Sequence, residues 1–494
     1  MSIPAKMDDR RKVIEYFQKQ QVFIQSEAVD YLMQQGDCMS NARRVLDCVD
    51  GKPLNIVLDD VKHVFQAGRH EQDERAASAD TSSISFREEP GQLEVLKDVT
   101  GNSCCEGTLT DFTKLFRDRY AQLHRLLRKR QEMKHVIPVK KARERDGAIS
   151  VIGIVDSVTR SSKGHVLMDI EDESGGATVY IPEEDAGMAD TLVEDEVIGV
   201  IGIGGRDGLL IAQQLLRPDV PVHQTRRRRN GNGYAAFASD IHIGSKTFLE
   251  KEWKKFMRWM NGEVGTSRQQ EVARHIRYLI IPGDVVEGVG IYPNQEQDLY
   301  IEDIYEQYRA LAEELSAVPR DVTIVLQPGN HDAVRQALPQ PAFEDDVQRI
   351  FSDLNVVFVG NPASVRLDGL EVLLYHGQSL FDFSTRIGVN QNQPTEIMKH
   401  MLMRRHMAPI YGEITPLAPE QQDYMVIDRI PDVFVTGHVH TTAIDSYRGV
   451  QLINASTWQS QTDYQRMMNF MPDPAKVPIV SLGSGRASLM DFSA

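Results

Sequence analysis

Five short apolar segments of the sequence each end close to residues whose side chains bind metal ions. The first, at 234–237, is followed by an Asp and a His that are separated by one residue. The other four are followed by Asp, Asn, His or paired His residues. In chain order, these candidate ligands are Asp240, His242, Asp284, Asn330, His376, His438 and His440. Because short apolar runs are typical of buried strands, the pattern predicts five strands that each end in a possible metal ligand.

This set of side chains indicates a particular chemistry. Alternate residues of a strand lie on one face, so Asp240 and His242 can reach the same ion. Mixed imidazole and carboxylate ligands suit manganese, iron or zinc rather than calcium. Two such ions about 3.5–4 Å apart polarise a phosphoryl oxygen and lower the pKa of a bridging water to near neutral. We therefore expect metal-assisted hydrolysis of a phosphoester, in preference to the alternative of unrelated core histidines and turn aspartates.

The five segments resemble the motifs of the calcineurin-like metallophosphoesterase superfamily. By this resemblance, the ligands of a first ion are Asp240, His242 and His440, and those of a second ion are Asn330, His376 and His438. Asp284 would bridge the two ions, and His331 matches a histidine that assists departure of the leaving group without binding metal. The resemblance implies two divalent ions as cofactors, with manganese as the first candidate and magnesium, iron and zinc as alternatives.

Three further segments, at 111–120, 404–412 and 455–462, narrow the resemblance. Together with a predicted OB fold ahead of the phosphoesterase motifs, they resemble the small subunit of archaeal family-D DNA polymerase over roughly residues 108–494. That family implies a proofreading 3′→5′ exonuclease that acts on single-stranded or mismatched 3′ ends of DNA and binds a separate large catalytic subunit. Gly288 stands where protein Ser/Thr phosphatases carry an arginine, which argues against a phosphoprotein substrate.

Two other functions stay open at this point. Another metallophosphoesterase, such as a phosphatase or a cyclic-nucleotide hydrolase, has the same five motifs, although the predicted OB fold and the segment around Arg404 argue against it. A non-catalytic accessory subunit would keep the fold and lose the metal ligands, as related eukaryotic subunits have. In this sequence every ligand position is filled.

The apolar patterns along the whole sequence predict a multidomain chain with α/β and all-β parts. The expected fold is a calcineurin-like β-sandwich flanked by helices, preceded by an OB-fold barrel and a small N-terminal helical module. The predicted divisions are a helical module at 1–68, a flexible linker at 69–107, a basic amphipathic helix at 108–146, the OB fold at 147–217, a linker at 218–233 and the nuclease domain at 234–494. Within the first linker, apolar residues at 93–99 allow a short strand.

The barrel is predicted from five segments of period-two pattern between 149 and 216. OB folds that bind single strands do so through stacked aromatic side chains and basic grooves. Here Tyr180 is the clear aromatic candidate and the turns are acidic, so a structural or subunit-docking barrel is favoured over one that reads DNA.

Two groups of basic residues are candidates for DNA contacts. Arg404 and Arg405 lie in a segment, 381–428, that interrupts the motif order, and paired arginines can clamp a phosphate. Pairing with neighbouring acids is the alternative, and His400 and His406 in the same segment are left without a role. The basic residues that follow 124 predict a solvated helix face, with phosphate contact as the alternative.

Composition sets further limits. The chain has 494 residues and a formal net charge of −16, and its length predicts about three domains. No segment approaches the roughly 20 apolar residues of a membrane span, and the first residues do not resemble a secretory signal. Four cysteines without zinc-site spacing fit a reducing compartment, so we expect a cytoplasmic protein without a membrane partner. Because the chain is acidic, DNA would have to be held by local basic patches or by a partner.

Overall fold

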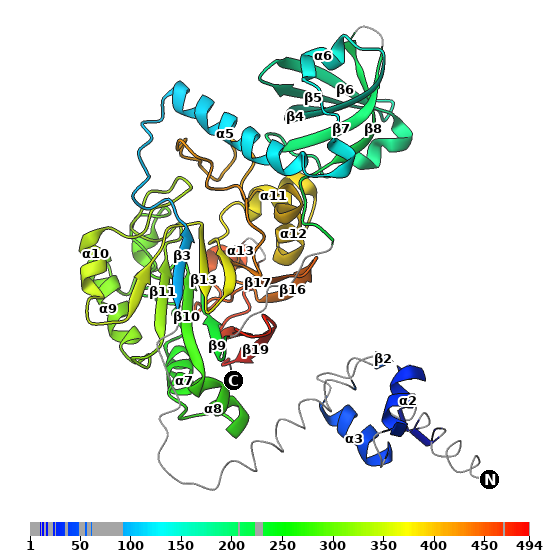
Figure 1. Cartoon of the computed structure of the whole chain (residues 1–494). Coiled ribbons are helices and arrows are strands. Elements are labelled where there is room, and N and C mark those ends of the chain that lie inside the picture. Colours follow the sequence, from blue (N-terminus) through cyan, green and yellow to red (C-terminus); the bar gives the residue numbers. More distant parts are fainter. Residues whose placement is uncertain are drawn as a thin grey trace, which may run out of the picture. The chain divides into compact units, whose positions relative to one another are not determined.

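The structure is a computed structural model of the chain (Figure 1). It describes residues 92–493, apart from 206–207, 223–230 and 468–469, and in the N-terminal part residues 10, 12–13, 16–17, 23–24, 26–34, 38–48, 55–56 and 61. The chain divides into two compact units, Met1–Phe86 and Arg87–Ala494. Across the described residues, no helix has the length and apolar character needed to cross a membrane.

The first unit contains helices α2 (Ser26–Gln34) and α3 (Cys38–Cys48), and strands β1 (Phe23–Ile24) and β2 (Asn55–Ile56), which pair in parallel. Its core includes Phe17, Val29, Leu32 and Val45, all fully or almost fully buried. These elements agree with helices in this part of the chain. The extent of the predicted module at 1–68 stays a prediction, because much of that range lies outside the described residues.

In the second unit, two six-stranded sheets pack face to face. The first has the order β12-β11-β10-β9-β18-β19 and the second β16-β17-β15-β14-β13-β3. The strands of the first sheet are β9 (Tyr234–Phe237), β10 (Ile276–Pro282), β11 (Thr323–Gln327), β12 (Val356–Phe358), β18 (Lys476–Ser481) and β19 (Ala487–Asp491). Those of the second are β3 (Leu93–Lys97), β13 (Ala363–Leu367), β14 (Leu370–Leu374), β15 (Val433–Thr436), β16 (Ala443–Tyr447) and β17 (Val450–Asn454). The five strands predicted ahead of the ligands are confirmed as β9, β10, β11, β14 and β15.

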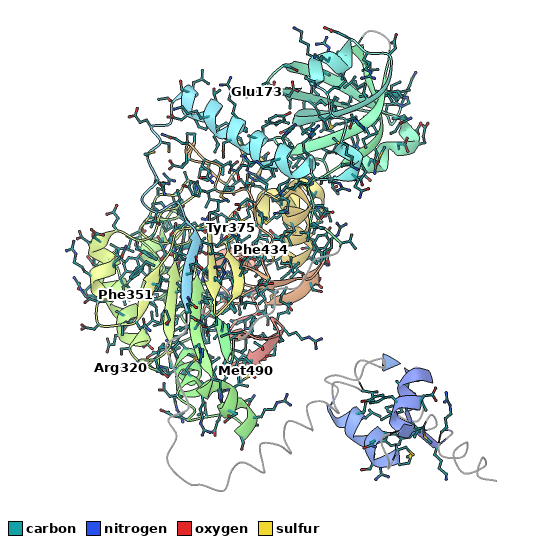
Figure 2. The ribbon with its side chains drawn as sticks, in the orientation of Figure 1. Glu173, Arg320, Phe351, Tyr375, Phe434 and Met490 are labelled. Carbon is teal, nitrogen blue, oxygen red and sulfur yellow. The ribbon has the colours of Figure 1, made fainter. Side chains whose placement is uncertain are left out.

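One apolar core fills the space between the sheets, and helices cover both outer faces. Side chains such as Phe237 and Ile280 from the first sheet meet Val372 and Val435 from the second. The outer face of the first sheet carries α7 (Glu250–Met260), α8 (Ser267–Arg274), α9 (Ile304–Leu315) and α10 (Asp345–Ile350), and that of the second carries α11 (Leu380–Ile387) and α12 (Pro394–Arg404). Tyr375 and Phe434, labelled in Figure 2, belong to the core that α11 and α12 bury. The mixed α/β class expected for this part of the chain is confirmed.

The five predicted period-two segments form a closed barrel. Its strands are β4 (Gly147–Arg160), β5 (Val166–Asp172), β6 (Gly175–Ile181), β7 (Val197–Gly204) and β8 (Leu210–Leu216), in the order β4-β5-β6-β8-β7. A 3₁₀ helix, η2 (Glu183–Ala189), lies between β6 and β7. Alternate apolar residues such as Val151, Met168 and Val179 point inward and are fully buried. The barrel is therefore present, and its assignment as an OB fold stays a prediction.

The basic helix is shorter than predicted. Helix α5 spans Leu109–Leu127 and is followed by a 3₁₀ turn, η1 (Gln131–Met133), and by α6 (Val139–Arg143), so no single helix covers 108–146. Met133 packs into the same cluster against the barrel as Leu123 and Leu127. On a continued helix it would lie about 120° away from that stripe, because six residues turn through roughly 600°. Burial of Met133 therefore outweighs the helix propensity of the intervening residues.

Both predicted linkers need correction where the structure describes them. In the linker predicted at 69–107, Leu93–Lys97 forms strand β3, which pairs with β13 at the edge of the second sheet. The strand allowed at 93–99 is thus confirmed, and this end of the segment belongs to the sandwich. In the linker predicted at 218–233, Asp219 and Val220 pack against the sandwich, where Val220 is fully buried. Residues 69–91 and 223–230 lie outside the described residues.

Candidate metal centre

The candidate ligands lie just beyond the carboxyl ends of five strands. Strands β9, β10 and β11 are parallel neighbours in the first sheet, and β14 and β15 are parallel neighbours in the second. Carboxyl ends of parallel strands meet at one edge of a sheet, so each sheet delivers its ligands to a single edge. The structure brings together all seven residues predicted as ligands, and His331 lies among them.

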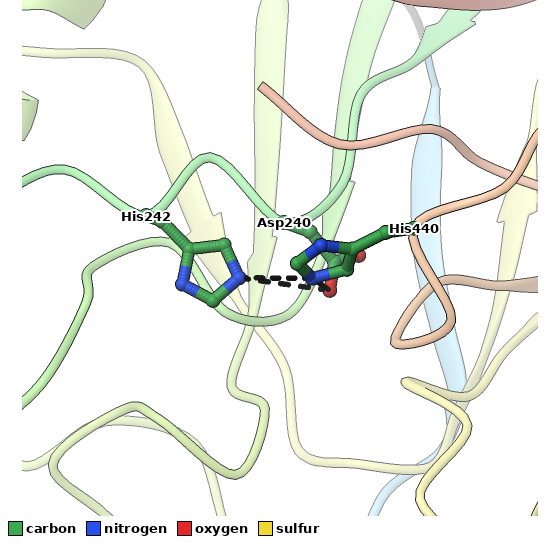
Figure 3. A group of neighbouring side chains, drawn as sticks. All are labelled: Asp240, His242 and His440. Atoms are coloured by element: carbon green, nitrogen blue, oxygen red, sulfur yellow. Dashed lines mark hydrogen bonds and ion pairs between the residues drawn. The ribbon is translucent and has the colours of Figure 1, made fainter. Parts of the chain in front are cut away.

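The first group consists of Asp240, His242 and His440 (Figure 3). His242 Nε2 lies 3.2 Å from His440 Nε2, and His440 Nε2 lies 3.3 Å from Asp240 Oδ1. All three side chains are buried. One ion can therefore contact all three side chains.

The second group consists of Asp284, His376 and His438, with Asn330 beside it. His376 Nε2 lies 3.1 Å from Asp284 Oδ2 and 3.1 Å from Asn330 Oδ1. The two groups touch, because the backbone N–H of His438 donates to Asp240 at 3.0 Å. This adjacency is what a pair of metal ions requires.

Unusual backbone conformations gather at these residues. Twelve non-glycine residues of the described chain have positive φ, and five of them are candidate ligands. They are Asp240, His242, Asp284, His438 and His440, with φ between 48° and 68°. Non-glycine residues reach this region at an energetic cost, and such strain concentrates at functional sites. The loops after β9, β10 and β15 therefore turn sharply, and candidate ligands are at these turns.

The far nitrogens of three histidines are held by fixed groups. His376 Nδ1 lies 2.9 Å from the carbonyl oxygen of Pro282, and His331 Nδ1 lies 2.8 Å from that of Glu287. His242 Nδ1 lies 2.9 Å from the carboxylate of Glu287. An acceptor at Nδ1 fixes the proton there and leaves Nε2 with its lone pair. The Nε2 atoms of the two ligand histidines, His242 and His376, thus face the centre, where an imidazole nitrogen can bind a divalent cation in place of a proton.

Glu287 was not found from the sequence. It is almost fully buried, and besides His242 its carboxylate accepts from the Tyr292 hydroxyl and the Gln459 amide. Burial raises its pKa, but His242 outweighs burial and holds the pKa below the ordinary value. The signal available in the sequence was an acidic residue three positions after Asp284, directly after two valines.

Charged side chains in the centre strongly shift one another's pKa values. Burial lowers the pKa of His242, but Glu287 outweighs it and raises that pKa to about 9. Burial likewise lowers the pKa of His376, and Asp284 raises it to about 9. For His331 burial dominates and lowers the pKa below its ordinary value. Because the carboxylates of Glu287 and Asp284 raise the pKa values of these two histidines, the centre favours positive charge, as a cation site must.

Glycine is required beside Asp284. A Cβ on Gly329 would lie 2.2 Å from Asp284 Oδ1, so any side chain there would displace the carboxylate. The backbone of Gly329 also holds Asp332 in place, because the Gly329 N–H donates to Asp332 Oδ2 at 2.8 Å. Burial, followed by the charge of Asp284, raises the pKa of Asp332 to about 7.

Arg404 and Arg405 do not form the predicted phosphate clamp. Their side chains are only 1% and 3% exposed. Arg404 Nε lies 3.2 Å from Glu196 of the barrel segment, and Arg405 Nε donates to the carbonyl oxygen of Ile427 at 2.7 Å. The alternative interpretation, pairing with acids, is therefore correct for Arg404. The sequence showed the charges but not that α12 is covered by the barrel segment.

His400 and His406 also serve the fold. His406 Nε2 lies 2.9 Å from Asp423 Oδ2, and burial lowers the pKa of His406 to about 4. Burial, with the nearby charge of Arg404, lowers the pKa of His400 to about 4 as well. Both imidazoles are therefore neutral near pH 7 and take no part in the metal groups.

Comparisons with known proteins relate this chain to subunits of DNA polymerases. Residues 235–444 match the family model that describes the B subunit of DNA polymerases alpha and epsilon. The DNA polymerase II small subunit of Archaeoglobus fulgidus is 44% identical over 79% of this chain and 79% of its own length. The small subunit of Methanothermobacter thermautotrophicus is 40% identical over 81% of this chain and 83% of its own, and that of Thermoplasma acidophilum is 36% identical over 98% and 93%.

Among solved structures, a novel archaeal phosphodiesterase is 13% identical and covers 52% of this chain and 98% of its own, with a TM-score of 0.27, which is too low to support an argument. The relatives, in contrast, match across most of both chains at high identity. The chain therefore belongs to the family of archaeal DNA polymerase II small subunits, the family that its sequence resembles.

Proposed function

We propose that this chain is the 3′→5′ proofreading exonuclease subunit of a heteromeric archaeal DNA polymerase, and that it hydrolyses DNA phosphodiesters with two divalent ions, manganese being the first candidate. The observation that carries the proposal is the convergence of seven buried or half-buried ligands into two adjoining groups. The names of the relatives support a role in DNA replication and a complex with a large catalytic subunit. In this proposal the protein is cytoplasmic and the barrel is an OB fold that serves as a docking element.

The residues divide the work between binding and proton transfer. When bound, two divalent ions polarise a phosphoryl oxygen and lower the pKa of a water between them. Asp240, His242 and His440 would hold one ion, and Asn330, His376 and His438 the other, with Asp284 shared. His331 keeps its Nδ1–H on the carbonyl oxygen of Glu287, so Nε2 is the nitrogen that exchanges a proton. We assign that nitrogen to protonation of the departing oxygen of the cleaved DNA, after Nε2 has taken up a proton from solvent.

The test is digestion of single-stranded and mismatched primer DNA, labelled at the 3′ or the 5′ end, by the purified chain with manganese. An Asp284→Ala variant is the control. Shortening from the 3′ end that the control abolishes is the expected result. Hydrolysis of a small phosphodiester without any digestion of DNA would point to another metallophosphoesterase.

An accessory role is the second candidate, because the relatives are named only as polymerase subunits. The same assay decides it once the large subunit has been added. No digestion of DNA or of a small phosphodiester, alone or in the complex, would make this chain a non-catalytic accessory subunit and would overturn the nuclease proposal.

A further inference from the structure

The outward face of α5 and the turn that follows it carry a row of cations. Between Asp111 and Lys129, the exposed residues are Thr113, Lys114, Arg117, Ala121, Arg125, Arg128 and Lys129. Five of these seven are basic and none is acidic. They recur at spacings of three and four residues, so they share the face opposite the buried residues Leu115, Leu123 and Leu127. From Lys114 to Lys129 the stripe is about 22 Å long at 1.5 Å per residue.

The basic side chains at the C-terminal end of this stripe are available to bind a ligand. Lys114 and Arg117 have distant ion-pair partners at 3.9 Å, Asp111 and Glu173. Within the described part of the chain, Arg125, Arg128 and Lys129 make no side-chain hydrogen bond or ion pair. Exposed cations continue beyond the helix at Lys134, Lys140, Lys141 and Arg145.

This concentration of positive charge is set against an acidic protein. Residues 108–146 contain 12 Lys and Arg against 5 Asp and Glu, whereas the chain as a whole has a net charge of −16. The barrel segment 147–217 is the reverse, with 4 basic residues against 13 acidic ones. A polyanion approaching this molecule is therefore repelled by the barrel strands and attracted to α5.

The chemistry of the stripe favours nucleic acid over protein. Protein interfaces have a core of aromatic and apolar side chains and are depleted in lysine, whereas DNA interfaces are strongly positive. No exposed aromatic or large aliphatic residue lies between Thr113 and Lys129. Single-stranded DNA is held mainly by stacking on aromatic side chains, which the stripe also lacks. A row of cations alone suits the regular phosphate backbone of a duplex.

We propose that the exposed stripe of α5, continued through Lys134 to Arg145, is a docking surface for the phosphate backbone of double-stranded DNA. This inference rests on the proposed function and extends it, since a mismatched 3′ end that the nuclease trims is joined to a duplex. It also replaces Arg404 and Arg405, which are buried, as the principal DNA contact outside the metal centre.

The test compares two triple variants of the full-length chain. The stripe variant is Arg125→Gln, Arg128→Gln and Lys129→Gln. The matched control removes the same charge at Arg268, Arg320 and Arg486, which are exposed and lie on α8 or in loops away from α5. Binding of a fluorescent primer-template duplex is measured by anisotropy from about 0.05 to 0.2 M salt, with metal chelated so that no hydrolysis occurs.

For three lost phosphate contacts, the slope of log K against log salt falls by about 2.7, and affinity at low salt falls on the order of tenfold or more. The control keeps the wild-type slope. Equal losses of DNA affinity in both variants would show that only the net charge of the protein matters, and would overturn the proposal. Unchanged DNA binding in the stripe variant would also overturn the proposal. If the stripe variant lost only its binding to the large subunit, the stripe would be reassigned to a protein contact.

Binding and catalysis are separated by a second measurement on the same proteins. Hydrolysis of a small phosphodiester with manganese does not use the stripe, so the stripe variant should keep it. If the wild type hydrolyses nothing, alone or with the large subunit, while the stripe variant still loses its salt slope, the docking surface stands and the nuclease proposal fails. If DNA is digested normally and the slope is unchanged, the nuclease stands and the docking surface fails.

Discussion

At the scale of single residues, the candidate centre depends on groups behind the ligands as much as on the ligands. His242 and His376 are related in this respect, because each has an acceptor on Nδ1 that leaves Nε2 for a cation. For His376 the acceptor is a backbone carbonyl that mutation cannot remove. For His242 it is the carboxylate of Glu287, so this contact is open to a direct test.

Replacing Glu287 by Gln should weaken metal binding by about 10- to 100-fold, because the charge that orients and polarises His242 is lost. Manganese affinity measured by calorimetry checks this. Tyr292→Phe is the matched control, since it removes one hydrogen bond to the same carboxylate and keeps its charge. Equal affinities for the wild type and the Gln variant would show that Glu287 does not position the ligand.

His331→Gln should lower kcat by about 10²–10⁴-fold, which is the usual contribution of a general acid or base. Bound manganese, measured by elemental analysis, should stay at the wild-type amount, since the proposal gives His331 no ion. His376→Gln serves as the comparison, because loss of a ligand should reduce metal content and kcat together. A parallel fall of both quantities in the His331 variant would make it a ligand.

Sequence reasoning worked at this scale where a residue's role follows from its chain neighbours. The seven candidate ligands stand out in the sequence because each follows an apolar strand, and the structure places them together. Glu287 was missed because its partner, His242, is 45 positions away in the chain. For Arg404 and Arg405 the sequence left a phosphate clamp and pairing with acids both open, because burial by distant segments leaves no local pattern.

At the scale of elements, buried ion pairs join the barrel to the sandwich. Glu196, which directly precedes β7, is 1% exposed and contacts Arg217 at 2.8 Å and Arg404 of α12 at 3.2 Å. Arg119 of α5 is fully buried and lies 2.7 Å from Asp423. Breaking such a pair leaves a desolvated charge, which costs more than the pair itself contributes.

Arg404→Met should therefore destabilise the protein by about 1–3 kcal/mol, since Glu196 loses one charged partner and keeps Arg217. Arg386→Met is the control, because the ion pair of Arg386 with Glu413 is partly exposed and its loss should cost about 1 kcal/mol or less. Urea unfolding followed by circular dichroism measures both. A cost for Arg404→Met as small as that of the control would contradict a structural role, and a loss of DNA affinity without a loss of stability would restore the phosphate clamp.

The same contact predicts a pH dependence. Burial raises the pKa of Glu196, but Arg217 and Arg404 outweigh burial and hold that pKa below its ordinary value of 4.5. A depressed carboxyl pKa adds stability above the unfolded pKa, and this stability is lost as the pH falls through the folded pKa. The difference in melting temperature between the wild type and Arg404→Met should be largest near pH 7 and shrink below about pH 4.5. A constant difference down to pH 3 would show that the charge of Glu196 is not involved.

Sequence patterns predicted most elements but not where they end. The capping box of Thr108 and Asp111 begins α5 as local chemistry requires. Its end at Leu127 depends on Met133 reaching the barrel, which no local pattern shows. Strand β3 was foreseen only as a possibility, because its partner β13 is about 270 residues away in the chain.

At the scale of the whole molecule, the stability of the sandwich depends on the segment that begins the second unit. Beyond β3, the segment that was predicted as a linker continues to contact the sandwich. Asp98 accepts from the Gly360 N–H at 2.9 Å, and Val99 is fully buried. Ser103 and the Cys104 N–H both donate to Glu420, a fully buried carboxylate that also pairs with Arg335.

Two truncations test this boundary. A chain that begins at residue 87 keeps β3 and all partners of Glu420, so it should bind manganese and melt within about 2 °C of the full-length protein. A chain that begins at residue 108 loses an edge strand and three backbone or hydroxyl donors to Glu420. Buried polar groups left without partners cost about 1–3 kcal/mol each, so this second chain should melt several degrees lower or fail to fold. Identical melting of the two truncated chains would mean that 87–107 is a linker after all, and early melting of both would mean that the first unit stabilises the second.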